Sequence, residues 1–248
     1  MDVSHPDFGH RPVIGPRIVR NVPRLDRALL DRFATAYTPD VSDAVGELYT
    51  MSADLGPLYR PARRLVGQAL TVKAPPGDNL TVHGALGLVQ PGDVLVVDWR
   101  GYTGGCGTGA GSLVVPYTRG LAGVVVDGGW RDVGELRDLG LPVYGRAISV
   151  FSPPKQRPGE INVPVCCGGV VVHAGDLIVA DEEGIAVVPR EHGQAVAASL
   201  RTYRPRKSLE EWDTAALETT MRERQHYFQA VFSRSGGTSL EWPGPGPA

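Results

Sequence analysis

The sequence predicts an α/β fold with helical extensions at both ends, and three observations support this prediction. Apolar runs of strand length alternate with helical patterns from about residue 65 to Val143, giving a β-α-β-α-β series. The 248 residues are 42% hydrophobic and 21% charged, which is enough for one large core. Turn residues, mostly Gly and Pro, separate the runs. We therefore expect an arm at 1–23, a single α/β domain at 24–203, a C-terminal helix at 204–234 and a disordered tail at 235–248.

The elements of this domain can be justified in chain order. Leucines and Phe33 at helical spacing predict a helix within 24–37, and Pro39 suits the first turn of a second helix at 38–48. The series itself is a strand at 65–73, a short helix at 79–89, a strand at 94–99, a glycine-rich loop with a short helix, a strand at 124–126, a helix at about 133–139 and a strand around Val143. Further helices are expected at 190–203 and about 208–233.

Residues 161–190 have a different pattern, in which short strand-like runs are broken by turns. This pattern predicts antiparallel or mixed sheet. Within it, "AGDLIVAD" (174–181) repeats the pattern of "PGDVLVVD" (91–98). A shared Gly-Asp turn that leads into an apolar strand explains the repeat as well as duplication would.

Composition excludes several classes of partner. A net charge of −2 gives no electrostatic reason to expect nucleic acid or an anionic membrane, and the basic residues at 201–207 read as a solvated loop. No apolar run approaches the roughly 20 residues that span a bilayer, and the N-terminus has no apolar signal core. Three cysteines without metal-ligand spacing, Cys106, Cys166 and Cys167, predict reduced thiols in a cytoplasmic protein.

The glycine-rich loop admits a nucleotide-binding alternative. Gly105, Gly107 and Ala110 fit G-x-G-x-x-A, and Asp127 closes the next strand where a ribose-binding carboxylate would lie. Against this, the glycines begin several residues after the strand, and the helix that follows is short and contains Pro116. We therefore do not favour a nucleotide site.

The same loop could bind an anion at a helix start. Ser112 can serve as the N-cap, and the backbone N–H groups of Leu113 and Val114 would then lie at the positive end of the helix dipole. Glycines at 109 and 111 would let a ligand approach the backbone. A tight turn that binds nothing is the alternative.

Arg131 and Asp132 stand together in "GVVVDGGWRDVGEL", just after a predicted strand end. Loops at the carboxyl ends of parallel strands form the ligand crevice of such folds. A guanidinium suits a carboxylate ligand, and a lone carboxylate suits a hydrated divalent cation. The alternative is a surface ion pair in which Asp132 caps the helix at 133–139.

Three segments carry a resemblance to a known family: "PPGDNLTVHGALGLVQPGDVLVVD", "GLAGVVVDGGWRDVGELRDLGLPVYGR" and "INVPV…GGVVVHAGDLIVADEEGIAVVPRE". Over roughly 38–195 the chain resembles the family of 4-hydroxy-4-methyl-2-oxoglutarate aldolase and the regulator of ribonuclease activity A, often mislabelled as demethylmenaquinone methyltransferase. The resemblance implies a swivelling-domain-like β/α sandwich, assembled as homotrimers or hexamers with sites between subunits.

The resemblance also implies roles for residues. Arg131 would hold the carboxylate of a 2-keto acid, and Asp132 would ligate Mg²⁺ or Mn²⁺. The helix-start backbone, from Gly111 and Ser112 to Leu113 and Val114, would share in binding the substrate. The implied reaction is retro-aldol cleavage or oxaloacetate-type decarboxylation, in which the metal stabilises an enolate.

The sequence departs from the family at one point. The aldolases carry a Gly–acid pair at the helix start, and the matching pair here is Gly111–Ser112, with the gap to Arg131 two residues shorter. This loss of a carboxylate implies altered chemistry, and a second family acid, from a neighbouring subunit's C-terminus, could be Glu210 or Glu211.

His83 could reach the site from the helix at 79–89, although a structural histidine is the expectation. Lys73 and Lys155 could contact an anion, although surface lysines are the expectation. The alternative to a lyase is a non-catalytic binding protein like the ribonuclease regulator. That branch tends to lose the aspartate after the arginine, so the presence of Asp132 favours an enzyme.

Overall fold

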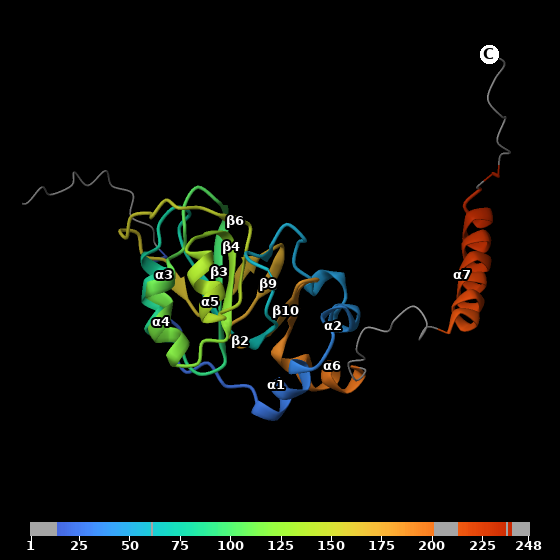
Figure 1. The fold of residues 1–248 in the computed structure, drawn as a ribbon, viewed down its shortest axis with the longest axis horizontal. Coiled ribbons are helices and arrows are strands. Elements are labelled where there is room, and N and C mark those ends of the chain that lie inside the picture. The colour runs from blue at the N-terminus through green and yellow to red at the C-terminus, as the bar shows by residue number, and fades with distance from the viewer. Residues whose placement is uncertain (1–13, 61, 201–212, 237, 240–248) are drawn as a thin grey trace, which may run out of the picture. The chain divides into compact units, whose positions relative to one another are not determined.

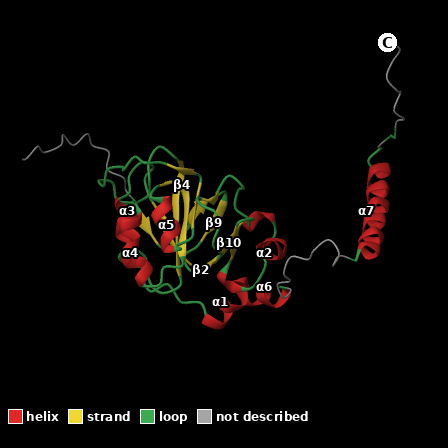
Figure 2. Cartoon of the chain, viewed as in Figure 1, coloured by secondary structure: helices red, strands yellow, loops and turns green. Residues whose placement is uncertain are grey.

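The computed structural model describes residues 14–60, 62–200, 213–236 and 238–239. The chain divides into two compact units, residues 1–203 and 204–248. The first unit confirms the predicted α/β class, with one large mixed sheet and helices packed on it (Figures 1 and 2).

The sheet follows the strand order β1-β5-β4-β3-β2-β10-β11. Its strands are β1 (Gly56–Pro57), β2 (Leu65–Lys73), β3 (Asp93–Tyr102), β4 (Gly123–Trp130), β5 (Val143–Gly145), β10 (Leu177–Asp181) and β11 (Gly184–Val188). Strands β2 to β5 pair in parallel, whereas β1, β10 and β11 pair antiparallel. Because β1 and β11 also contact each other, the sheet is nearly closed.

Short strands complete the described part of this unit. They are β6 (Ala147–Ile148) beside β4, β7 (Glu160–Ile161) beside β2, and a separate hairpin of β8 (Val165–Cys167) and β9 (Val170–Val172). The mixed and antiparallel pairing predicted for 161–190 is therefore confirmed.

Two groups of helices cover the sheet (Figure 1). The helices α3 (Leu80–Leu86), α4 (Ala110–Thr118) and α5 (Val133–Leu139) contribute apolar side chains to the core on one face of β2–β4. The helices α1 (Arg27–Ala34), α2 (Thr38–Val45) and α6 (Gly193–Ser199) pack against β10 and β11. Two 3₁₀ turns, η1 (Glu47–Tyr49) and η2 (Arg190–His192), lie between elements.

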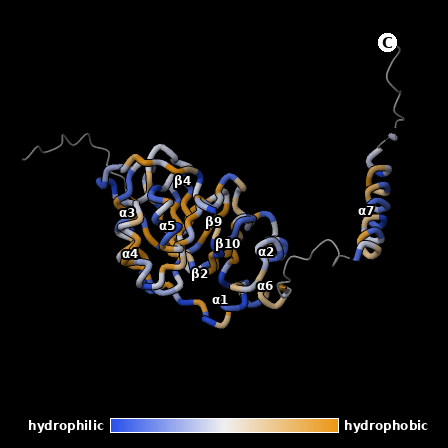
Figure 3. The backbone as a smooth tube through the Cα atoms, viewed as in Figure 1, coloured by the Kyte–Doolittle hydropathy of each residue, from blue (hydrophilic) through white to orange (hydrophobic). Residues whose placement is uncertain are grey.

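Strand β4 shows how the sequence positions the functional end of the sheet. All eight of its residues are buried, as expected of a parallel strand covered on both faces. Figure 3 shows the hydrophobic colour of the residues in this part of the sheet. Val124, Val126 and Trp130 join the core beneath α3–α5, while Val125 joins the core beneath the β8–β9 hairpin. Each such side chain contributes about 1.5–3 kcal/mol by leaving water, so the strand end is firmly placed.

The repeated segments at 91–98 and 174–181 share one turn. Asp93 accepts the N–H of Gln90 and Asp176 accepts the N–H of His173, both at 2.8 Å. In both turns the residue before the aspartate is a glycine with positive φ. The predicted common turn chemistry is confirmed, and it brings β3 and β10 to either side of β2.

The second unit contains α7 (Thr214–Arg234), whose N-cap Asp213 accepts the N–H of Ala216 at 3.0 Å. None of the residues of α7 is buried, and Leu217, Met221 and Phe228 share one exposed face. The predicted basic loop at 201–207 and the acids Glu210 and Glu211 lie outside the described residues, as do most of the arm and most of the tail. No helix in the described ranges is both long and apolar enough to cross a membrane.

Candidate active site

Arg131 and Asp132 follow directly on the buried end of β4, where the chain turns into α5. Asp132 has a left-handed backbone, with φ of 59°. This conformation is uncommon outside glycine, although Asp and Asn adopt it more readily than other residues. It turns the aspartate side chain toward α4, the helix that precedes β4.

The carboxylate of Asp132 is fixed by that neighbouring helix. The N–H of Ala110, the first residue of α4, donates to Oδ2 of Asp132 at 3.0 Å. Although Asp132 occupies the N-cap position of α5, its side chain makes no capping hydrogen bond there. The expected side-chain cap is therefore not formed, whereas the expected ion pair is present, with Nε of Arg131 3.6 Å from Oδ2 of Asp132.

Gly109 makes this approach possible. A Cβ built at Gly109 would lie 2.1 Å from Oδ2 of Asp132, far inside any real contact. Gly107 has a similar function two residues earlier, since its Cβ would lie 2.2 Å from the ring of Trp130. The glycine-rich loop thus lets the start of α4 pack closely against the end of β4.

The start of α4 differs from the sequence prediction. The N-cap is Gly109 and the helix begins at Ala110, so the expectation that Ser112 caps the helix is wrong. A glycine cap has no side chain, and the serine two residues into the helix gave a misleading signal. The predicted absence of an acid is confirmed, because the first turn of α4 contains none.

One backbone donor stays open at this helix start. Ala110 donates to Asp132 and Ser112 donates to the carbonyl of Gly109 at 3.2 Å, whereas the N–H of Gly111 has no acceptor among the described residues. Leu113 and Val114 are the fourth and fifth residues of the helix, with the Leu113 side chain fully buried. Their part in ligand binding stays a prediction.

Arg131 lies beside this carboxylate with unused donors. Its Nε is 3.6 Å from Oδ2 of Asp132, and its Nη1 donates a long hydrogen bond of 3.5 Å to the carbonyl of Val150. Nε itself is buried without a hydrogen-bond partner. Such a group is unfavourable unless a ligand or water completes it. Since about a third of each side chain is exposed, at 36% for Arg131 and 35% for Asp132, a ligand can reach the pair.

A buried polar cluster that the sequence did not reveal lies next to Arg131. Cys106 is fully buried, and its carbonyl accepts a hydrogen bond from Nδ2 of Asn79 at 3.5 Å. Oδ1 of Asn79 is buried and has no partner. Burial raises the pKa of the Cys106 thiol, and the nearby charges of Arg131 and Lys155 oppose that rise. The cysteine is therefore a neutral thiol at the edge of the site.

Lys155 also affects His83. Burial, followed by the charge of Lys155, lowers the pKa of His83, so its imidazole is neutral at pH 7. The charge of Lys155 thus affects both His83 and Cys106, and the expectation that His83 and Lys155 are structural or surface groups stays a prediction.

Lys73 is not brought to this site. Its Nζ lies 3.6 Å from Glu160, and the residue lines an open cavity of about 510 Å³ with Asp98, Asp127 and Cys166. Asp127 binds Arg146 and accepts the N–H of Gly168 at 2.9 Å, so its carboxylate is occupied within the fold. The nucleotide-binding alternative therefore lacks its ribose-binding acid.

The ligands that the site offers decide which metal ion could bind there. Within the described ranges, no three His, Cys, Asp or Glu side chains gather as a metal site. Oδ1 of Asp132 nevertheless makes no hydrogen bond with any described residue, whereas Oδ2 accepts the N–H of Ala110. Mg²⁺ commonly binds one or two carboxylates and completes its shell with water and substrate, so a single free oxygen fits this ion.

Comparison with known proteins identifies the relatives of this chain. The family model described as RraA-like, Aldolase/RraA, matches residues 38–187. A putative 4-hydroxy-4-methyl-2-oxoglutarate aldolase from Halalkalibacterium halodurans is 38% identical over 161 residues, which cover 65% of this chain and 76% of that protein.

Two solved structures have the same fold. Streptomyces coelicolor RraAS2, described as an unusual member of the RNase ES inhibitor RraA family, is 30% identical with a TM-score of 0.65, covering 72% of this chain and 93% of its own. A Geobacillus kaustophilus protein described as a 2-dimethylmenaquinone methyltransferase is also 30% identical, with a TM-score of 0.57 and coverage of 62% and 95%. The resemblance and the mixed use of names expected from the sequence are both confirmed.

Proposed function

Because this chain belongs to the RraA-like aldolase family, we propose that it is a divalent-metal-dependent lyase that breaks a carbon–carbon bond in a 2-keto acid. The reaction would be retro-aldol cleavage or decarboxylation of an oxaloacetate-like acid. The observation that carries the proposal is Arg131, whose buried Nε lacks a partner beside a carboxylate that is held in place.

Each group has a defined part in this proposal. Arg131 would bind the carboxylate of the substrate through its free donors, since a guanidinium matches a carboxylate in shape and charge. The open N–H of Gly111 would donate to the same ligand at the positive end of α4. These contacts would orient the keto group toward Asp132.

The metal would be held by Oδ1 of Asp132, with Oδ2 kept in place by Ala110. When bound, Mg²⁺ or Mn²⁺ would polarise the 2-keto group and offset the charge that develops there. No acid stands in the first turn of α4 to move a proton. We therefore infer that the chemistry favours a step that needs no base at the leaving group, as in loss of CO₂.

A substitution of Arg131 tests this assignment. Arg131→Lys keeps the charge but removes the planar fork, so we expect kcat/KM for oxaloacetate with Mn²⁺ to fall about ten- to a hundredfold. Pyruvate release measures the rate. Arg137→Lys on α5, an exposed arginine, is the matched control and should retain full activity. If Arg131→Lys retains wild-type kcat/KM, the carboxylate lies elsewhere.

Assembly is part of the same proposal. The family resemblance implies a homotrimer or hexamer with sites between subunits, and α7 carries an exposed apolar face that suits contact with another chain. Light scattering on the purified protein would test this, and a stable, active monomer would contradict it. We also expect the protein in the cytoplasm.

A second candidate is a non-catalytic, ribonuclease-regulator-like protein. Exposed Ile148, Val150 and Phe151 lie beside Arg131 and would suit a protein partner. Inhibition of an RNase ES-type enzyme by the purified chain, lost in Phe151→Ser but kept in Asp132→Asn, would favour this function over the lyase.

A further inference from the structure

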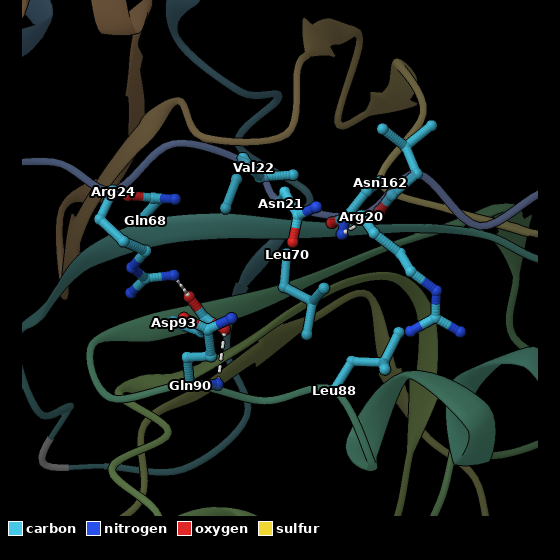
Figure 4. A pocket seen from close by; sticks show the side chains of 12 residues that line it. Arg20, Asn21, Val22, Arg24, Gln68, Leu70, Leu88, Gln90, Asp93 and Asn162 are labelled. Carbon is cyan, nitrogen blue, oxygen red and sulfur yellow. Dashed lines mark hydrogen bonds and ion pairs between the residues drawn. The ribbon is translucent and has the colours of Figure 1, made fainter.

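A second cavity lies at the opposite end of the sheet from Arg131. It has a volume of about 150 Å³ and lies beneath the N-terminal arm, against the first half of β2 and the start of β3 (Figure 4). Strands β2, β3 and β4 run parallel. Asp93 at the beginning of β3 and Arg131 just after the end of β4 therefore lie at opposite ends of the strands. The cavity is therefore separate from the proposed active site.

The arm crosses this cavity between two fixed points. At one, the N–H of Val19 donates to the carbonyl of Ile161 at 3.0 Å, and Asn162 Nδ2 donates to the carbonyl of Val19 at 2.9 Å. At the other, Gln68 donates to the carbonyl of Pro23 at 3.1 Å and accepts the N–H of Leu25 at 2.7 Å.

Arg20, Asn21 and Val22 span the interval between these points. Their backbone and side-chain groups make no hydrogen bond with any residue in the described ranges. Asn21 has a left-handed backbone with φ of 58°, as does Asn162 below it with φ of 60°. Two residues that line the cavity, one in the arm and one after β7, therefore have an uncommon backbone conformation.

Of the two arginines that line the cavity, only one has an ion-pair partner within the described ranges. Arg24 forms an ion pair with Asp93, whose second oxygen accepts the N–H of Gln90 at 2.8 Å, so this end is neutral. Arg20, an exposed residue that lines the cavity, has no ion pair within the described ranges. In Figure 4, Arg20 and the Arg24–Asp93 pair stand on opposite sides of Leu70.

The remaining lining is apolar with a few unused amides. Leu70 and Leu88 form the wall between the charged groups, and Val22 of the arm lies across from them (Figure 4). Val19 also lines the cavity. The side chains of Asn21 and Gln90 make no hydrogen bond with described residues, so both can bind a ligand. A cavity of about 150 Å³ holds a molecule the size of benzene, that is, about six heavy atoms.

We propose that this cavity binds a small carboxylate with a short apolar chain. The carboxylate pairs with Arg20 and accepts from the amides of Asn21 or Gln90, while the chain lies against Leu70 and Leu88. The bound anion supplies the negative counter-charge that Arg20 lacks among the described residues. When the carboxylate contacts both Arg20 and Gln90, it also links the arm to the turn before β3.

Butyrate, with six heavy atoms, is the probe, and titration calorimetry measures its binding. The protein carries Arg131→Gln, so that the proposed active site does not contribute a second carboxylate site. We expect Arg20→Gln in this background to weaken butyrate binding about tenfold or more, because a charge-assisted hydrogen bond is lost. Arg27→Gln, at an exposed arginine that pairs with Asp31, is the matched control and should bind as the background does. Uncharged butyramide should bind far more weakly than butyrate.

Hydrogen exchange provides a second, independent measurement. Butyrate should slow exchange of the Val19 and Leu25 N–H groups, which anchor the arm on either side of the cavity. The proposal is overturned if Arg20→Gln binds butyrate as tightly as its background, or if the Arg131→Gln protein shows no saturable binding. Neither result would affect the lyase proposal, which depends on Arg131 and Asp132.

Discussion

The backbone N–H of Ala110 donates to Oδ2 of Asp132 at 3.0 Å, joining the start of α4 to the residue that precedes α5. Oδ2 also lies 3.6 Å from Nε of Arg131, whereas Oδ1 makes no hydrogen bond with any described residue. The geometry of the site therefore depends on the start of α4 and on the residue before α5. Substitutions at either place can test it.

Removal of the charge at Asp132 should abolish turnover and preserve the fold. In Asp132→Asn the side-chain oxygen can still accept from Ala110, and asparagine tolerates the left-handed backbone. We expect Mg²⁺- or Mn²⁺-dependent activity to disappear while the circular dichroism spectrum and the oligomer stay unchanged. Wild-type activity that survives exhaustive chelation would show that no divalent metal is required.

Gly109 and Gly111 offer a matched pair of substitutions. Gly109→Ala places a methyl group where Oδ2 of Asp132 lies, so we expect a loss of about 1–3 kcal/mol in the free energy of unfolding together with a large fall in activity. Gly111→Ala meets nothing within 4 Å and should be neutral or stabilising by up to about 1 kcal/mol. Urea denaturation measures both, and equal effects would mean that the close approach is not required.

The absence of an acid at the start of α4 should affect which reaction is faster. Decarboxylation releases CO₂ without a base, whereas retro-aldol cleavage needs a proton removed from the aldol hydroxyl. We expect wild-type protein to decarboxylate oxaloacetate more readily than it cleaves 4-hydroxy-2-keto diacids. Equal rates for the two substrates would show that the missing acid does not matter.

Ser112→Glu tests the same point from the other direction. Ser112 is the third residue of α4, and a carboxylate there should raise the aldolase rate more than the decarboxylase rate. Ser112→Gln has the same shape without the charge and should raise neither. Product analysis by chromatography separates the two activities.

His83 should make stability depend on pH below neutrality. Because its folded pKa is lowered, the unfolded chain binds the proton more readily than the folded one. The neutral imidazole therefore contributes to the free energy of unfolding. This contribution is fully present above the ordinary pKa of 6.5 and is lost as the pH falls toward the lowered pKa of the folded state. His83→Gln should flatten this part of the stability profile, and Lys155→Gln should flatten it partly. A steep profile in His83→Gln would assign the effect to another group.

The sequence predicted the regular elements where the patterns were local. β2 at 65–73 and α5 at 133–139 have the predicted bounds. Apolar residues of strand length indicate β2, and Gly140 marks the end of α5. β3 was expected to end at Trp99 but continues to Tyr102, because a register shift after Asp98 with left-handed Arg100 and Gly101 lets the strand resume pairing.

The details of the site were harder to predict because they arise from long-range contacts. Arg131 and Asp132 were identified from their place after a strand, but the partner of Asp132 belongs to another helix. Ser112 looked like a cap because serine is a strong cap, whereas Gly109 is required there by the packing of Asp132. The cavity under the arm depends on Val19 and Leu25 docking on distant strands, which no local pattern encodes.

The left-handed backbone of Asp132 has a consequence for how this fold can evolve. Only aspartate, asparagine and glycine adopt that conformation readily, so a single change at this position that keeps the fold will usually give asparagine or glycine. Both replacements remove the carboxylate and leave β4, α5 and the surrounding surface in place. Under the proposed role of Asp132, such a change would remove catalysis in one step and leave the surface available to a partner.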